Sequence, residues 1–141
     1  MKKLLTMLVV TLLCTATPCA AQDINQLPAV ARNFINQYFP QIKVSYVIMD
    51  RDLFDKEYEV LLADRTEIKF DSDGQWKEVD CKRAAVPDGI VPDYILKYVR
   101  DTFPEEFITQ IERGRKGTEV ELRNDVSFLF NRRGRLIEVD D

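Results

Sequence analysis

The 141-residue chain contains no histidine, which removes the commonest general base near neutral pH and the commonest zinc ligand. Ser-His and Cys-His catalytic pairs are excluded for the same reason. Glycine is also scarce: there are five, and none has the spacing of a phosphate-binding loop, so nucleotide binding has no support. We therefore expect a protein that is not an enzyme and has no catalytic residues and no cofactor.

The N-terminal segment has the three parts of a secretory signal peptide. Lys2 and Lys3 precede an apolar run from Leu4 to Cys14, and small residues end the segment at Ala20 and Ala21. We expect cleavage after Ala21 and a periplasmic or secreted protein. The apolar run is shorter than the about 20 residues that span a bilayer, so we expect no membrane span.

Cysteine is scarce as well, and two of the three cysteines lie in this segment. Cys14 and Cys19 stand where a lipoprotein would carry its lipidated cysteine, but Leu13 and Pro18 precede them, where a small residue is normal. Once residues 1–21 are removed, Cys81 is alone and an intrachain disulfide is excluded. We expect an incidental free thiol at Cys81, with a redox or covalent role as the alternative.

Without residues 1–21 the chain has 18 basic and 24 acidic residues, a formal charge of −6. This charge disfavours nucleic acids and anionic membranes as partners. The remaining 120 residues suffice for one core, whereas two independent halves of about sixty residues would each be marginal.

A stretch of the sequence occurs twice. The residues from Glu59 to Asp80 return from Glu119 to Asp140 at a constant offset of 60, and residues 27–40 align with residues 91–104. We expect a first repeat at 22–81, a linker at 82–90 and a second repeat at 91–141, which share a core or a continuous sheet. The identical pairs are Glu59/Glu119, Val60/Val120, Leu62/Leu122, Phe70/Phe130, Gly74/Gly134, Glu78/Glu138, Val79/Val139 and Asp80/Asp140.

The periodicity of each repeat predicts a helix followed by four antiparallel strands, an α+β fold. Pro28 and Pro92 suit the first turn of the two helices, and Pro40 and Pro104 end them. The expected strands are 43–49, 56–63, 65–71 and 75–80, and then 106–113, 116–123, 126–131 and 135–140.

Strand alternation assigns side chains to two faces of the sheet. The face toward the helices is expected to carry Tyr58, Val60, Leu62, Ile68, Phe70 and Val79, and in the second repeat Val120, Leu122, Phe128, Phe130, Ile137 and Val139. Apolar residues ringed by carboxylates remain on the opposite face, a pattern of protein interfaces, although a merely solvated sheet face is the alternative. The candidate protein-binding residues are Glu59, Leu61, Trp76, Glu78, Leu129 and Leu136.

Two acidic residues of the turn at 71–74 allow a different hypothesis. Asp71 and Asp73 resemble part of a calcium loop, but the further oxygen ligands of such a loop are missing, and turn chemistry explains Asp and Gly without a metal. We predict no metal ligands here. A small-ligand or ion-responsive envelope protein that uses its acidic turns is the alternative function.

The first repeat contains the motifs Leu27-Pro28, Phe39-Pro40, Tyr58-Glu59-Val60, Phe70-Asp71, Gly74, Trp76 and Val79-Asp80. With these motifs, the order of the elements resembles the PepSY-like, β-lactamase-inhibitor-like family of secreted bacterial proteins. The second repeat departs from the pattern at Thr118, Asn131 and Leu136. The resemblance implies helices packed on four-stranded antiparallel sheets, and a non-enzymatic binding or inhibitory role toward a protein or peptide of the cell envelope.

Overall fold

The computed structural model describes residues 23–51 and 54–141, so the predicted signal peptide, with Cys14 and Cys19, lies outside the described residues. Helices α1 (Ala29–Tyr38) and α2 (Asp93–Thr102) each begin directly after a proline. Each helix is preceded by a short 3-10 helix, η1 (Ile24–Gln26) or η2 (Asp88–Ile90). The predicted helices are confirmed. None of the described helices is long and apolar enough to cross a membrane.

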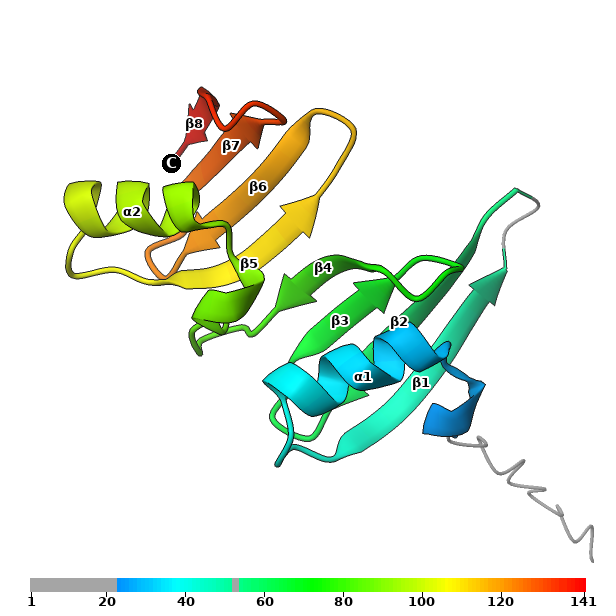
Figure 1. The fold of residues 1–141 in the computed structure, drawn as a ribbon. Coiled ribbons are helices and arrows are strands. Elements are labelled where there is room, and N and C mark those ends of the chain that lie inside the picture. The colour runs from blue at the N-terminus through cyan, green and yellow to red at the C-terminus, as the bar shows by residue number, and fades with distance from the viewer. Residues whose placement is uncertain (1–22, 52–53) are drawn as a thin grey trace, which may run out of the picture.

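Eight strands form one antiparallel sheet in chain order, as Figure 1 shows. We call α1 to β4 the first half of the molecule and α2 to β8 the second half. The strands of the first half are β1 (Val44–Arg51), β2 (Lys56–Leu62), β3 (Glu67–Phe70) and β4 (Trp76–Asp80). Those of the second half are β5 (Ile108–Arg113), β6 (Gly117–Leu122), β7 (Ser127–Asn131) and β8 (Leu136–Asp140).

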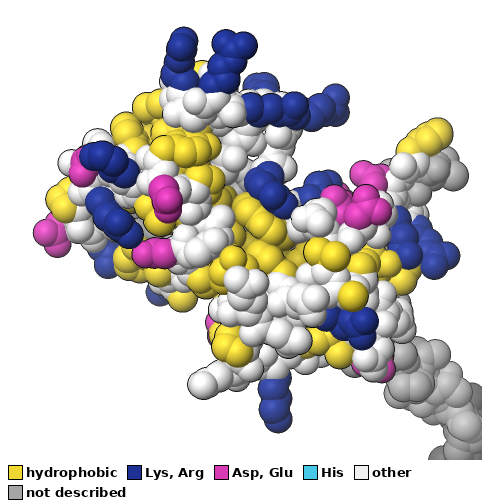
Figure 2. Space-filling view, viewed as in Figure 1, with side chains coloured by type: hydrophobic (Ala, Val, Ile, Leu, Met, Phe, Trp, Pro, Cys, Tyr) yellow, Lys and Arg dark blue, Asp and Glu magenta, His cyan; other side chains and the backbone are white. Residues whose placement is uncertain are grey.

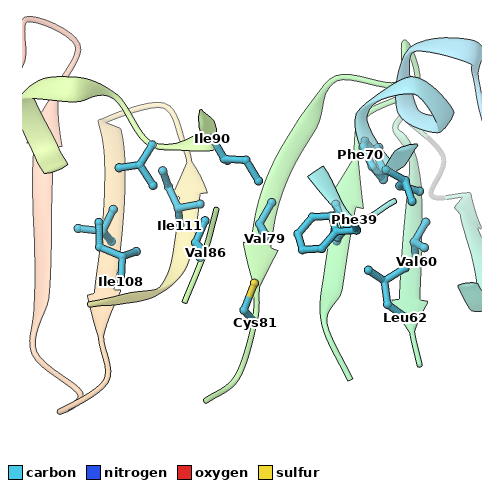
Figure 3. Packing of buried hydrophobic residues seen from close by; sticks show 14 of the residues in the cluster. Phe39, Val60, Leu62, Phe70, Val79, Cys81, Val86, Ile90, Ile108 and Ile111 are labelled. Carbon is cyan, nitrogen blue, oxygen red and sulfur yellow. The ribbon is translucent and has the colours of Figure 1, made fainter. Parts of the chain in front are cut away.

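The two halves join where β4 pairs with β5. Val79 lies opposite Ile111, with Glu78 opposite Glu112 and Asp80 opposite Gln110. The sheet is therefore continuous across the middle of the chain, a point that the sequence left open. Figure 3 shows Val79 and Cys81 beside Val86, Ile90 and Ile111 from the following part of the chain.

One face of the sheet is apolar and is covered by both helices. We call it the helix face. Its central row runs in register from β1 to β7, and every member is at most 2% exposed. The row consists of Val47, Val60, Ile68, Val79, Ile111, Val120 and Phe128. Ala31 and Ile35 of α1, and Ile95 and Val99 of α2, are buried in the same cluster, so the halves share one core. On the side seen in Figure 2, hydrophobic side chains also reach the surface where the halves meet.

The edge strand β8 differs from the expectation. Ile137 and Val139 were expected on the face toward the helices, but both side chains are exposed. Val139 does face the same way as Phe128, its neighbour on β7. It stays exposed because β8 has no neighbour on its outer side among the described strands, whereas its counterpart β4 is flanked by β5.

Candidate binding face

The face of the sheet opposite the helices, which we call the distal face, carries a row of charged side chains. Neighbours in this row lie directly opposite each other on adjacent strands. In order from β1 to β8 the row contains Ile48, Glu59, Lys69, Glu78, Glu112, Glu119, Leu129 and Glu138. Five carboxylates and one lysine thus share one line across the whole sheet.

Lysines form ion pairs with Glu78, Asp80 and Glu67 on the distal face of the first half. The Lys69 Nζ lies 2.6 Å from Glu78 Oε2, and Gln110 donates to the other oxygen of Glu78 at 2.8 Å. Lys82 pairs with Asp80 at 2.6 Å and with Glu67 at 3.1 Å. The hydrogen bond to Glu78 raises the pKa of Lys69, and burial opposes this rise.

The second half keeps the carboxylates of the row but not the lysine. Leu129 occupies the position between Glu119 and Glu138 that Lys69 occupies between Glu59 and Glu78. In the part of the chain that the structure describes, no ion pair involves Glu112, Glu119 or Glu138. Nearby on β6, burial, followed by the charges of Asp125, Asp80 and Glu119, raises the pKa of Glu121.

A groove of about 360 Å³ lies over this part of the distal face, and we call it the Leu129 groove. Its lining comes from all four strands of the second half and from the β5–β6 turn. The lining residues are Glu112, Gly114, Arg115, Lys116, Gly117, Glu119, Ser127, Leu129, Glu138 and Asp140.

The structure places four of the predicted binding residues on the distal face. Glu59 lies opposite Lys69, Leu61 opposite Glu67, Glu78 opposite Lys69 and Leu129 opposite Glu119. Leu61 also lies opposite Tyr46 of β1, whose side chain is exposed. The first-half residues and Leu129 stand on opposite sides of the β4–β5 junction. They therefore belong to one continuous surface but not to one pocket.

The prediction that Trp76 and Leu136 lie on the distal face is wrong. The register of β3 and β4 shifts by one residue, so that Lys69 lies opposite Glu78 while Phe70 lies opposite Trp76. The extra residue is a β-bulge, and it turns Trp76 to the side of the buried Phe70. An equivalent shift between β7 and β8 places Leu136 opposite the buried Phe130.

Trp76 packs between the two halves on the helix face. The Phe34 ring of α1 lies with its centroid 6.1 Å from that of Trp76, and the Arg113 guanidinium lies 3.8 Å from the centre of the Trp76 ring. Arg113 Nε also donates to the Trp76 carbonyl oxygen at 3.0 Å, and burial lowers the pKa of Arg113. These contacts give Trp76 a structural role at the junction, in place of a role in the distal surface.

The turns that carry Asp71 and Asn131 have the same pattern of hydrogen bonds. Asp71 Oδ1 accepts from the backbone N–H of Asp73 and of Gln75, both at 2.9 Å. Asn131 Oδ1 accepts from Arg133 and Arg135 in the same way. The side-chain oxygen at this position therefore holds the turn in both halves, whether or not it carries a charge. Among the described residues, no group of three or more acidic, Cys or His side chains could hold a metal ion.

Cys81 lies buried at the end of β4. Burial raises the pKa of its thiol to about 11, against a smaller lowering by the Thr66 hydroxyl. Since the thiolate is the reactive form, the thiol is poorly suited to nucleophilic or redox chemistry at neutral pH.

We expect Cys81 to react with a thiol reagent at pH 8 at least about a hundredfold more slowly in the folded protein than in urea. The unfolded chain releases this proton at about pH 8.5, before the folded protein does. The protonated Cys81 thiol therefore makes its full contribution to folding stability below about pH 8.5. This contribution, roughly 2 to 3 kcal/mol, is lost as the pH rises toward 11. Chemical denaturation from pH 7 to pH 11 measures the loss of stability in the wild type and in Cys81→Ala. Because both proteins contain the same lysines, which titrate in the same pH range, the difference between the two losses is the contribution of Cys81. Equal alkaline losses in the two proteins would contradict the pKa assignment.

The fold and the distal face define an α+β protein with a single open antiparallel sheet. The family model described as "Putative beta-lactamase-inhibitor-like, PepSY-like" matches residues 56–138. The chain belongs to this PepSY-like family, as the sequence motifs predict.

Two solved structures share the fold over most of their length. One is a "putative periplasmic protein" from Bacteroides vulgatus, 39% identical, with a TM-score of 0.81 and coverage of 84% of this chain and 94% of that chain. The other is a "putative calcium-regulated periplasmic protein" from Bacteroides thetaiotaomicron, 38% identical, with a TM-score of 0.82 and coverage of 84% and 94%. The comparison with curated proteins gives no match.

Proposed function

We propose that this protein is a non-enzymatic binding protein of the bacterial envelope that presents the distal face to a protein or peptide. The observation that carries the proposal is the asymmetry of the sheet. Both helices cover one face, and the other is left as a continuous surface with carboxylates in register. A wide, one-sided antiparallel sheet with apolar residues among polar ones suits docking better than it suits catalysis.

The binding residues that we propose are Glu59, Leu61, Glu78 and Leu129. Leu61 and Leu129 are half-buried and supply apolar contact area, while the glutamates form a polar surround. Trp76 and Leu136 are not included, because they face the helices. The surplus of carboxylates favours a partner with a basic surface and accelerates its encounter.

The proposed location rests on the chain's N-terminal segment and on the family. Residues 1–21 have the pattern of a signal peptide, and both similar structures are described as periplasmic. We also infer that the two halves are copies of one unit, residues 22–81 and 91–141, joined by a linker at 82–90. The constant offset of 60 and the equivalent bulges in β3–β4 and β7–β8 support this inference.

The test is affinity capture from the native envelope with immobilised protein, followed by mass spectrometry. Replacing Leu61 with Ser removes an apolar contact from the distal face, and we expect about tenfold weaker capture of a specific partner. Leu96→Ser is the matched control, because Leu96 is a half-buried leucine on α2, on the helix-covered side. Thermal melting serves to check that both variants fold. A partner captured equally by wild type and Leu61→Ser would refute the distal face as the binding surface.

Calcium regulation is a second candidate, since one similar structure is described as a calcium-regulated periplasmic protein. In this chain the carboxylates of Asp64, Asp71 and Asp80 already accept hydrogen bonds in their turns. A calcium titration that follows the melting temperature and the fluorescence of the single tryptophan tests this candidate. If neither changes at millimolar calcium, regulation by calcium binding to this chain is excluded.

A further inference from the structure

We propose that the Leu129 groove binds the side chain of one lysine presented by the partner, with the ammonium group between Glu119 and Glu138 and the aliphatic stem on Leu129. This inference rests on the proposed function and specifies the chemistry of the partner. It identifies a binding site in the second half that has no counterpart open to a partner in the first half.

The first half supplies the template for this site. There the Lys69 side chain lies on the distal face between Glu59 and Glu78, and its Nζ contacts Glu78 at 2.6 Å. The charges of Glu59 and Glu112 also act on Lys69 and raise its pKa further. The row of carboxylates is therefore built to accommodate an ammonium group, and in the first half the chain provides that group itself.

The second half retains the acceptors and omits the donor. Glu119 and Glu138 hold the same register positions on either side of Leu129, 60 residues after Glu59, Glu78 and Lys69. Gln110, which satisfies the second oxygen of Glu78, also has no equivalent beside Glu138, because β8 has no outer neighbour among the described strands. Glu119 and Glu138, which form no ion pair among the described residues, lie on either side of the apolar Leu129 side chain, and this arrangement favours the binding of a cation.

The spacing of the carboxylates favours a lysine over a metal ion. Glu119 and Glu138 lie on β6 and β8, with β7 between them, so their backbones are about 10 Å apart. Calcium requires its oxygen ligands at about 2.3 to 2.6 Å, a convergence that no group of described residues provides. A lysine has a long apolar stem that lies on Leu129 and an end that forms hydrogen bonds with carboxylates on either side.

The charges around the groove also limit its occupant to a single cation. Arg115 and Lys116 of the β5–β6 turn line the groove beside Gly117. They would repel a polybasic segment, which would have to place a second positive charge near this turn. A single lysine flanked by small, uncharged residues would pair with the carboxylates and would place no second positive charge near Arg115 and Lys116.

The probe is a capped pentapeptide with one lysine between alanine and glycine residues, titrated into ¹⁵N-labelled protein and followed by the backbone amide signals. We expect shifts centred on Glu119, Leu129 and Glu138, and none with the same peptide carrying norleucine in place of lysine. Replacing Leu129 with Lys supplies the cation internally, as Lys69 does, and should weaken the binding of the peptide at least about tenfold. Ile48→Lys is the matched control: it adds the same charge to the distal face at the opposite end of the row, on β1 and outside the groove, and should leave the affinity within about twofold.

A gain of binding completes the test. Lys69→Leu should create a second set of shifts around Glu59 and Glu78, because it reproduces the second half's arrangement in the first half. Three results would overturn the inference: no shifts at the groove in the wild type, equal binding of the norleucine peptide, or displacement of the peptide by calcium at the same amides.

The outcome separates this inference from the proposed function. Envelope capture that depends on Leu61 but survives Leu129→Lys rejects the lysine site and keeps the distal face as a binding surface. Capture that does not depend on Leu61 rejects the proposed function, whereas the peptide titration still decides whether the groove binds lysine.

Discussion

Replacing Val79 with Asp is expected to prevent the protein from folding under physiological conditions. Val79 is 0% exposed and lies between Ile68 of β3 and Ile111 of β5. The substitution loses the burial of the valine side chain and places a carboxylate in an apolar site with no cation opposite it. The expected cost is roughly 5 kcal/mol or more, which is comparable to the whole stability of a domain of this size.

Circular dichroism and urea denaturation measure the effect, and Val139→Asp is the matched control. Val139 has the same position in β8 as Val79 has in β4, between a glutamate and an aspartate, yet it is 56% exposed. Its substitution should change stability by about 0.5 kcal/mol or less. If the two variants were equally stable, the assignment of Val79 to the shared core would be wrong.

The contrast between these valines explains why the chain is one folding unit. In the first half, β5, Val86 and Ile90 complete the environment of the last strand. Among the residues that the structure describes, the second half has no such cover along β8. Each half of about sixty residues would bury too little apolar surface to be stable alone, whereas the junction between β4 and β5 merges them into one core.

The sequence predicts most of this fold because its signals are local. The prolines at 28 and 92 mark the starts of both helices, and alternation of apolar and polar residues identifies all eight strands within about two residues of their bounds. Burial then follows from the pattern, since one face of each strand must cover the core. The pairing of β4 with β5 depends on contacts across the linker, and no local pattern specifies it.

The β-bulges in β4 and β8 are the reason why the alternation of side chains along a strand failed to predict the faces of Trp76 and Leu136. Strict alternation puts Trp76 and Val79 on opposite faces, because they are three residues apart. One extra residue in the strand reverses the side of everything before it, and this moves Trp76 and Leu136 to the helix face. The available signal was a pair of large apolar residues at an odd spacing in each half, since both residues of the pair are better placed against a helix than in water.

The candidate face was predicted in part. Glu59, Leu61, Glu78 and Leu129 follow from their own strands, and their placement on the distal face is confirmed by the register. Glu112 was not recognised, because its position in the row depends on the junction between the halves. The difference between Lys69 and Leu129 is visible when the sequences of the two halves are aligned, but its significance depends on the ion pair between Lys69 and Glu78.

Gly117→Ala should be the most damaging of the conservative substitutions. Gly117 begins β6 with a φ of +151°, a conformation that residues with a Cβ rarely adopt. A Cβ there would lie 2.8 Å from the Cα of Asn131 and closer still to the carbonyl oxygen of Phe130 on β7. Because both neighbours are backbone atoms of the paired strand β7, the strands would have to separate, at a cost of roughly 3 kcal/mol or more.

Thermal melting measures this effect against Gly114→Ala, the same substitution in the same hairpin. A Cβ at Gly114 meets nothing closer than the Gly117 carbonyl oxygen at 4.0 Å, so its stability should change by about 0.5 kcal/mol or less. Gly117→Ala should lower the melting temperature by roughly 10 °C or more, and equal melting temperatures would contradict the clash with β7. Gly117 also lines the Leu129 groove, next to Arg115 and Lys116 in the chain. If Gly117→Ala still folds, it should also weaken the binding of the lysine peptide.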